Sequence, residues 1–215
     1  MGRHFSVLSA VLLLVGLVAA SCGITPENEP IAGSDAGDPC PAVVRVEPTE
    51  LVVGEVMSSS VSAANHVLCP GAFETSPPMS GDHFPAWQNC GFYDRAVRDE
   101  TATHSLEHGA VWIAYDPDLE TAMVDEIRAL SQTDDHFLAA PYPGLKNPIV
   151  LSAWQRQVAV DTISDPAVAS FVADQLGRVS KTAPEAGVSC EGGVGEPGGD
   201  PDLQYAEAYE YYRSQ

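Results

Sequence analysis

The sequence has little positive charge. Its 215 residues include 10 Lys and Arg against 30 Asp and Glu, which gives a formal net charge of -20 at pH 7. Nucleic-acid binding requires a concentrated basic surface, and electrostatic adhesion to anionic lipid requires the same. The composition therefore argues against both kinds of partner, and the acidity is typical of a well-solvated surface.

Several catalytic motifs are also missing. The sequence contains no GxSxG nucleophile elbow, no glycine-rich phosphate-binding loop and no CxxC pair. These absences argue against a serine hydrolase, a nucleotide-binding enzyme and a dithiol redox enzyme. The sequence thus favours a protein that is not an enzyme, with one motif, HxxEH, left to consider.

The N-terminus has the pattern of a bacterial lipoprotein signal. Residues 1–21 contain Arg3, an apolar run that is short for a membrane span, and small residues directly before Cys22. We expect Cys22 to be lipidated, so that the exported protein is anchored to a bacterial membrane, at its periplasmic face or at the cell surface. An ordinary secretory signal is the alternative. Residues 22–41 are rich in Pro, Gly and acidic residues and predict a tether.

The other cysteines predict disulfides. Without Cys22 an even number remains in an oxidising compartment, and two bonds follow. Four cysteines allow three connectivities, of which we favour a local Cys69–Cys90 bond together with a Cys40–Cys190 bond between the ends of the domain.

The rest of the chain predicts one α+β or mixed α/β domain over residues 42–184, followed by an acidic, Gly- and Tyr-rich tail over 185–215. Apolar spacing indicates a helix over 119–130 and another over 165–176, and valine-rich segments indicate strands, including one or two within 43–56. A small sheet should therefore pack against about two helices. The Pro-rich, aromatic residues 76–87 predict a long ordered loop.

The HxxEH motif, from His104 to His108, is the strongest chemical signal. Two imidazoles four residues apart share one face of a helix and can bind a metal ion. The same order occurs in inverted zincins, where the glutamate is a general base. Here Gly109 and a strand follow at once, so we expect a short turn at the lip of a sheet, and a metal-dependent hydrolase is only a minor alternative.

Several motifs together resemble one family. The segments that carry the resemblance are His66-Val67, Pro77-Pro78-Met79-Ser80-Gly81-Asp82-His83, Gly91-Phe92-Tyr93, His104-Ser105-Leu106-Glu107-His108-Gly109 and Pro141-Tyr142-Pro143. In order and spacing this part of the chain, roughly residues 66–176, is similar to the domain-of-unknown-function 3105 family of bacterial exported and membrane-anchored proteins. The resemblance implies that His66, His83, His104, Glu107 and His108 are recurring polar positions. It implies no activity, and Met79 departs from the family pattern.

These histidines predict a transition-metal site. We expect His83, His104 and His108 as ligands, with His66 or Met79 completing the set and with Glu107 and Asp82 supporting the ligands. Both zinc and copper fit such a set, and the thioether of Met79 slightly favours copper. The predicted function is metal capture, buffering or delivery. The alternative is a non-enzymatic envelope interaction or structural module in which the histidines only brace the loop.

Overall fold

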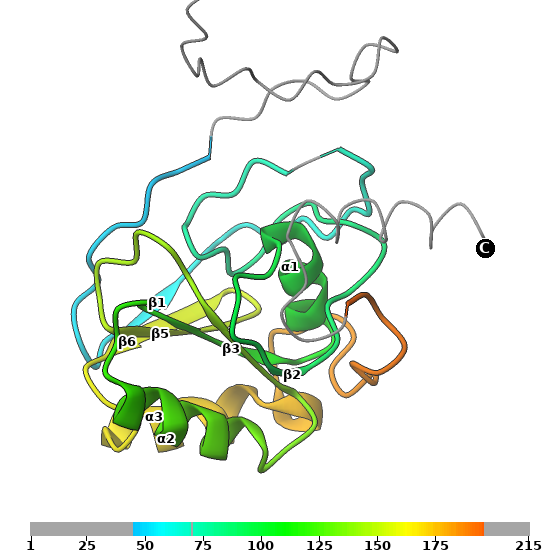
Figure 1. Ribbon diagram of the computed structural model, residues 1–215. Coiled ribbons are helices and arrows are strands. Elements are labelled where there is room, and N and C mark those ends of the chain that lie inside the picture. The colour runs from blue at the N-terminus through cyan, green and yellow to red at the C-terminus, as the bar shows by residue number, and fades with distance from the viewer. Residues whose placement is uncertain (1–44, 70, 196–215) are drawn as a thin grey trace, which may run out of the picture. The chain divides into compact units, whose positions relative to one another are not determined.

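The computed structural model, which describes residues 45–69 and 71–195, is built around a mixed six-stranded sheet (Figure 1). The predicted signal, Cys22, the tether, Cys40 and the end of the tail lie outside the described residues. In chain order the strands are β1 Val56–Ser58, β2 Gly91–Phe92, β3 Val111–Tyr115, β4 Phe137–Pro141, β5 Ile149–Ala153 and β6 Arg156–Val160. Their order in the sheet is β1-β6-β5-β3-β4-β2.

The sheet combines parallel and antiparallel pairs. Strand β4 runs parallel to both β3 and β2, whereas β5 is antiparallel to β3 and to β6. The connection between β3 and β4 is a helix, as a parallel crossover requires. This arrangement confirms the predicted α+β class.

Alternate residues of the central strand β3 supply two separate cores. Val111 and Ile113 belong to the apolar cluster that includes helices α2 (Thr121–Ser131) and α3 (Pro166–Gln175). Trp112 and Ala114 belong to a second cluster, with Leu106 of helix α1 (Asp99–Glu107). Because side chains alternate along a strand, α1 covers one face of the sheet while α2 and α3 cover the other (Figure 1).

Helices α2 and α3 begin and end close to the predicted positions. The side chain of Asp165 accepts a hydrogen bond from the backbone N–H of Ala167, and Pro166 occupies the first turn of α3. Both features are typical of a helix N-terminus. None of the described helices is long and apolar enough to cross a lipid bilayer.

Helix α1 was not predicted as a full helix. It has nine residues, of which all but Asp99 are buried, and most of them are polar. A polar sequence carries no apolar stripe, so the periodicity that identifies a surface helix is missing here. The HxxEH motif therefore lies at the C-terminal end of a buried helix, and our expectation of a short turn at the lip of the sheet was wrong.

Two arginines hold the N-terminal end of α1. Arg45 binds the carboxylate of Asp99 and lies 2.8 Å from that of Glu100, while the Nε of Arg98 lies 3.3 Å from Glu100. The side chain of Glu100 is completely buried. A buried carboxylate is tolerated when cations pair with it, so these contacts join the loop residues Arg45 and Arg98 to the start of α1.

Gly109 reverses the chain between α1 and β3, and this geometry gives a first prediction. Its φ is +95°, and a Cβ placed there would lie 2.7 Å from the carbonyl oxygen of Gly177. We expect Gly109→Ala to lower the free energy of unfolding by about 3 kcal/mol, from left-handed backbone strain and this clash. Urea denaturation measures the loss. Gly54→Ala is the control, since Gly54 has φ +78° with open space around it; equal losses in the two variants would contradict the role of the clash.

The N-terminal strand prediction was partly wrong. Strand β1 begins at Val56, at the very end of the predicted segment 43–56, and Val53 forms only an isolated bridge to Ala159. The described residues from 45 to 52 form no strand. Several of the valines in this region are exposed, so residue type alone misled the prediction.

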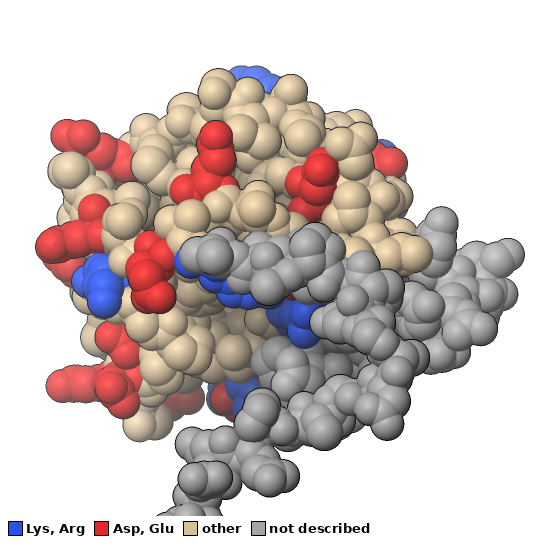
Figure 2. Space-filling view, turned by 90° about the horizontal axis from the view of Figure 1, so that it is seen from above, with Lys and Arg blue, Asp and Glu red and all other residues tan. Residues whose placement is uncertain are grey.

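The surface carries the acidic excess of the sequence. Figure 2 shows one face of the molecule with acidic side chains scattered around it and fewer basic ones. The acidic groups on this view do not gather into one dense patch, which agrees with the interpretation of the charge as solvation.

Candidate metal centre

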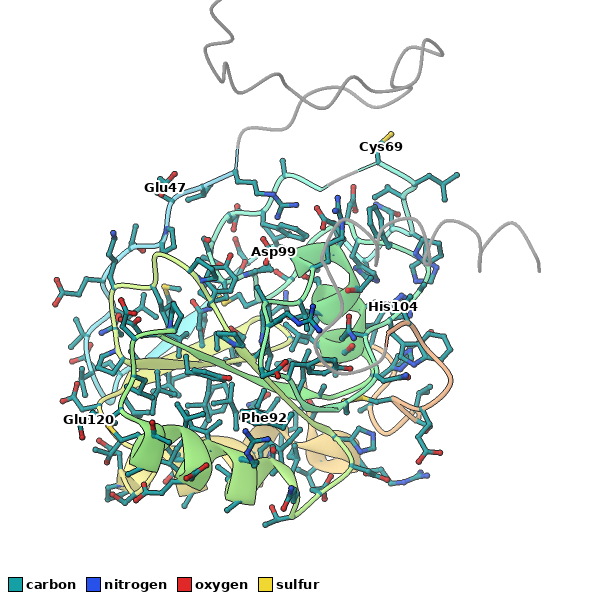
Figure 3. All side chains as sticks on the ribbon, viewed as in Figure 1. Glu47, Cys69, Phe92, Asp99, His104 and Glu120 are labelled. Atoms are coloured by element: carbon teal, nitrogen blue, oxygen red, sulfur yellow. A yellow bond between two sulfur atoms is a disulfide. The ribbon has the colours of Figure 1, made fainter. Side chains whose placement is uncertain are left out.

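The candidate site begins at His104, near the C-terminal end of α1 (Figure 3). The side chain is buried, and its Nδ1 lies 2.7 Å from the carbonyl oxygen of Phe84 in the long loop. A carbonyl only accepts, so Nδ1 carries the proton and Nε2 keeps its lone pair. Metal-binding histidines are commonly oriented in this way through their second nitrogen.

His83 and Glu107 face each other beside His104. His83 is fully buried; its Nδ1 donates to the carbonyl oxygen of Gly81 at 2.8 Å, and its Nε2 lies 3.0 Å from Oε2 of Glu107. Because Nδ1 of His83 carries the proton of this hydrogen bond, Nε2 of His83 and the carboxylate of Glu107 are both acceptors. A second proton or a cation between them is required for this contact to be favourable.

His66 closes the group from the more exposed side. Its ring stacks on that of His104, with centroids 4.7 Å apart, and its Nε2 lies 3.5 Å from Oε2 of Glu107. A parallel backbone bridge joins His66 to His83, and Asp82 accepts hydrogen bonds from the backbone and side chain of Asn65. Asp82 thus helps to position the residue next to His66.

The four residues form a compact ligand set. His66, His83, His104 and Glu107 each offer one ligand atom, and these atoms all lie within 4.8 Å of one another. Neighbouring ligand atoms around a tetrahedral ion with ~2.0–2.1 Å bonds are about 3.4 Å apart. Closure around an ion therefore requires side-chain movements of about 1 Å.

This grouping differs from the predicted one in two respects. Glu107 belongs to the ligand group itself, whereas His108 does not; His108 forms a second group with His104 and Glu185. Met79 is buried, and its carbonyl oxygen accepts a hydrogen bond from the backbone N–H of Gln155, which attaches the loop to the turn between β5 and β6.

Burial sets the protonation of the site. Desolvation lowers the pKa of His104 to about 3, and it also lowers the pKa of His108. Burial alone would raise the pKa of Glu107, but its hydrogen bond and electrostatic interaction with His83 bring it below its usual value. A neutral imidazole beside an ionised carboxylate is the form that binds metal ions.

The segment 185–195 packs beside the site, although we had assigned it to a tail. The backbone N–H groups of Glu185 and Gly187 donate to the carbonyl oxygens of Glu107 and His108, at 3.0 and 2.8 Å. The domain therefore extends at least to residue 194, and Glu185, which reaches the site, was missed because it lies so far along the sequence. Its Gly-rich surroundings gave no signal of packing.

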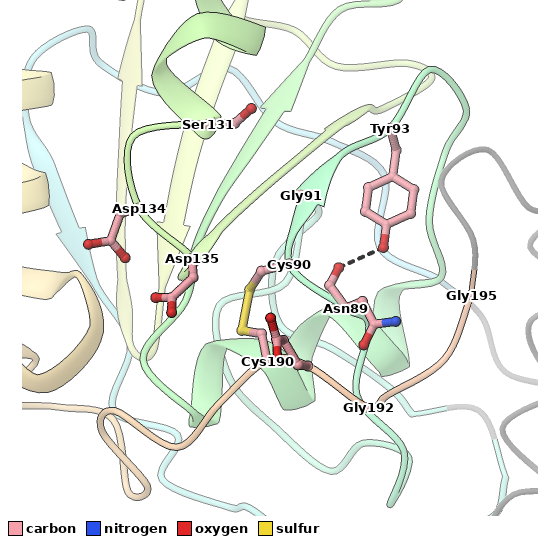
Figure 4. A pocket seen from close by; sticks show the side chains of 11 residues that line it. Asn89, Cys90, Gly91, Tyr93, Ser131, Asp134, Asp135, Cys190, Gly192 and Gly195 are labelled. Carbon is pink, nitrogen blue, oxygen red and sulfur yellow. Dashed lines mark hydrogen bonds between the residues drawn. A yellow bond between two sulfur atoms is a disulfide. The ribbon is translucent and has the colours of Figure 1, made fainter.

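A disulfide fastens this segment. Cys90 is bonded to Cys190, so the favoured Cys69–Cys90 and Cys40–Cys190 pairing was wrong; Cys69 is itself disulfide-bonded elsewhere. Figure 4 shows the Cys90–Cys190 bond in the wall of an open pocket that is also lined by Asp134 and Asp135. Spacing in sequence favoured the shorter loop, whereas the actual bond joins the edge strand β2 to the C-terminal segment.

A comparison with known families identifies the family of this chain. The model of the DUF3105 family, described as a protein of unknown function, matches residues 66–192, more than half of the chain. The chain belongs to this family. The DUF3105 match contains every residue of both ligand groups and extends beyond the predicted resemblance to include Cys190. No curated protein and no solved structure matches the chain.

Proposed function

We propose that this DUF3105 protein binds a transition-metal ion through His66, His83, His104 and Glu107, for metal capture, buffering or delivery. The carrying observation is the convergence of three imidazoles and a carboxylate, with two of the imidazoles donating from Nδ1 to backbone carbonyls, which leaves their Nε2 atoms available to bind an ion. The proposal includes export and a lipid anchor at Cys22, which are supported by the sequence pattern alone.

The donor set favours zinc or copper. Three nitrogen ligands and one carboxylate oxygen suit Zn²⁺ and Cu²⁺ better than Ca²⁺ or Mg²⁺, which prefer sets made of oxygen. The slight preference for copper comes from the sequence, in which Met79 lies four residues before His83, and not from this ligand set. Catalysis is not part of the proposal, since all four side chains of the group are engaged as ligands and a catalytic metal needs an open position for water.

A metal-binding measurement tests this function. We expect protein purified after zinc or copper supplementation to carry about one ion per chain, and saturating metal at a thousand times Kd to stabilise it by about 4 kcal/mol. His66→Ala should weaken metal binding at least about tenfold, because it removes one of the four ligands. The side chain of His66 is half-exposed, so its removal should disturb the packing of the domain little. Metal analysis and thermal unfolding with and without metal provide the measurements.

The matched control is His136→Ala. His136 lies in a separate group with the exposed Asp134 and Asp135 that shares no residue with the proposed site, so its replacement should leave the ion at the proposed site in place. Absence of stoichiometric metal in the wild type, with a thermal midpoint insensitive to zinc and copper, would refute the proposal.

The structural alternative rests on the same His83–Glu107 contact. A proton in place of a metal ion would make this a buried ion pair that braces the loop against α1. If the structural alternative holds, Glu107→Gln lowers the free energy of unfolding by the same amount with and without metal. If the protein binds metal at this site, the loss of unfolding free energy is larger when metal is present.

A further inference from the structure

A second ligand group adjoins the first and shares one residue with it. His104, His108 and Glu185 offer ligand atoms that also lie within 4.8 Å of one another. The rings of His104, on α1, and His108, the residue that directly follows α1, are 4.8 Å apart and perpendicular. Nδ1 of His108 donates to the carbonyl oxygen of Ser189 at 3.1 Å, which leaves Nε2 3.5 Å from Oε2 of Glu185.

We infer that the two groups are alternative positions for a single divalent transition-metal ion, which passes between them while His104 stays bound. His104 has one nitrogen with a free lone pair, because Nδ1 donates to Phe84. One lone pair binds one ion, and a bridging imidazolate would require loss of the Nδ1 proton. The two positions are therefore mutually exclusive.

Each position has its own solvent-exposed member. The side chain of His66 is 46% exposed and that of Glu185 is 48% exposed, whereas His83, His104 and His108 are buried. Trp87 packs against the rings of both His104 and His108, with centroids 5.6 and 5.0 Å away, and covers the shared part. An ion can thus arrive beside one exposed ligand and depart beside the other. This inference rests on the proposed function and narrows it to delivery.

The C-terminal segment holds the second position in place. The N–H of Glu185 donates to the carbonyl oxygen of Glu107, the last residue of α1, while Trp87 donates from its indole nitrogen to the carbonyl oxygen of Cys190 at 2.9 Å. Glu185, the exposed ligand of the second group, is consequently hydrogen-bonded to the backbone of Glu107, a ligand of the first group. The transfer needs an exchange of ligands around His104 and no movement of α1.

Copper(II) binding to variants of the whole mature chain tests the inference. Glu107→Gln weakens the first position and leaves the second intact, so this variant should still bind one ion, with fewer than three nitrogen ligands in its electron paramagnetic resonance spectrum. Glu107→Gln combined with Glu185→Gln should bind at least about tenfold more weakly than Glu107→Gln alone. The control pair is Glu107→Gln with Glu191→Gln, since Glu191 lies in the same segment but in neither ligand group.

The outcomes separate the two proposals. A shared, two-position site is supported by three results together. The wild type binds one equivalent of copper, adding Glu185→Gln to Glu107→Gln lowers the copper affinity further, and adding Glu191→Gln does not. Two tightly bound equivalents, or equal affinities of the Glu107→Gln variant and its Glu185→Gln double variant, overturn the inference and leave the proposed function standing. A wild type that binds no copper or zinc refutes both. Circular dichroism of every variant verifies that it is folded.

Discussion

Replacing both Cys90 and Cys190 by Ala is expected to lower the free energy of unfolding by about 4 kcal/mol. The bond links residues 100 positions apart, and closing a loop of that length restricts the unfolded chain by about 4.7 kcal/mol in the chain-entropy model, near the upper end of measured values. Urea denaturation of the wild type and the double variant measures the difference.

The loss should be concentrated in the C-terminal segment. The amides of Glu185, Gly187 and Val194 are hydrogen-bonded to the carbonyl oxygens of Glu107, His108 and Trp87. We expect their hydrogen exchange to accelerate more than that of β3 in the double variant. Val111, within β3, serves as the internal reference. A loss below about 1 kcal/mol, or unchanged exchange at these amides, would show that packing alone retains the segment.

Acid is expected to destabilise the metal-free protein through His104. Burial lowers the pKa of this imidazole from 6.5 in the unfolded chain to about 3 in the folded one, so the folded state binds fewer protons. The stability from the neutral imidazole is complete above pH 6.5 and is lost as the pH falls toward 3. Between pH 6.5 and 4 the loss from this group is about 3 kcal/mol.

The contribution of Asp99 to the free energy of unfolding changes with pH in the opposite direction, so the control protein must also contain Asp99. The side chain of Asp99 is only 12% exposed, and desolvation raises the pKa of its carboxyl from 3.8 to about 6. Its contribution is therefore complete below pH 3.8 and is lost as the pH rises to 6. The wild type and His104→Gln share Asp99, and the difference between their unfolding free energies at pH 7, 6, 5 and 4 isolates His104. Parallel pH profiles of the two proteins would contradict the assigned pKa.

The outer layer of the fold could be predicted from the sequence. The spacing of Leu119, Met123 and Ile127 identified α2 because that helix has one apolar face toward the sheet. Capping residues similarly identified the start of α3. Helix α1 gave no such pattern, since it buries polar side chains whose partners, such as Arg45 and Gln88, come from other parts of the chain.

The candidate site could be predicted only in part. The histidines were recognised from their clustering and from the family resemblance, and His83 does meet His104. The contact of Glu107 with His83 depends on the rotation of α1, which no local pattern determines. Glu185 depends on the disulfide, and the three possible connectivities were equally compatible with the cysteine count.

The shape of the sheet edges has a consequence for association between copies of the chain. One edge strand, β1, has three residues and the other, β2, has two. Long edges expose rows of unpaired N–H and C=O groups that recruit strands from other molecules, whereas edges this short offer few. The described domain is thereby protected against edge-to-edge polymerisation, even when many copies are crowded together.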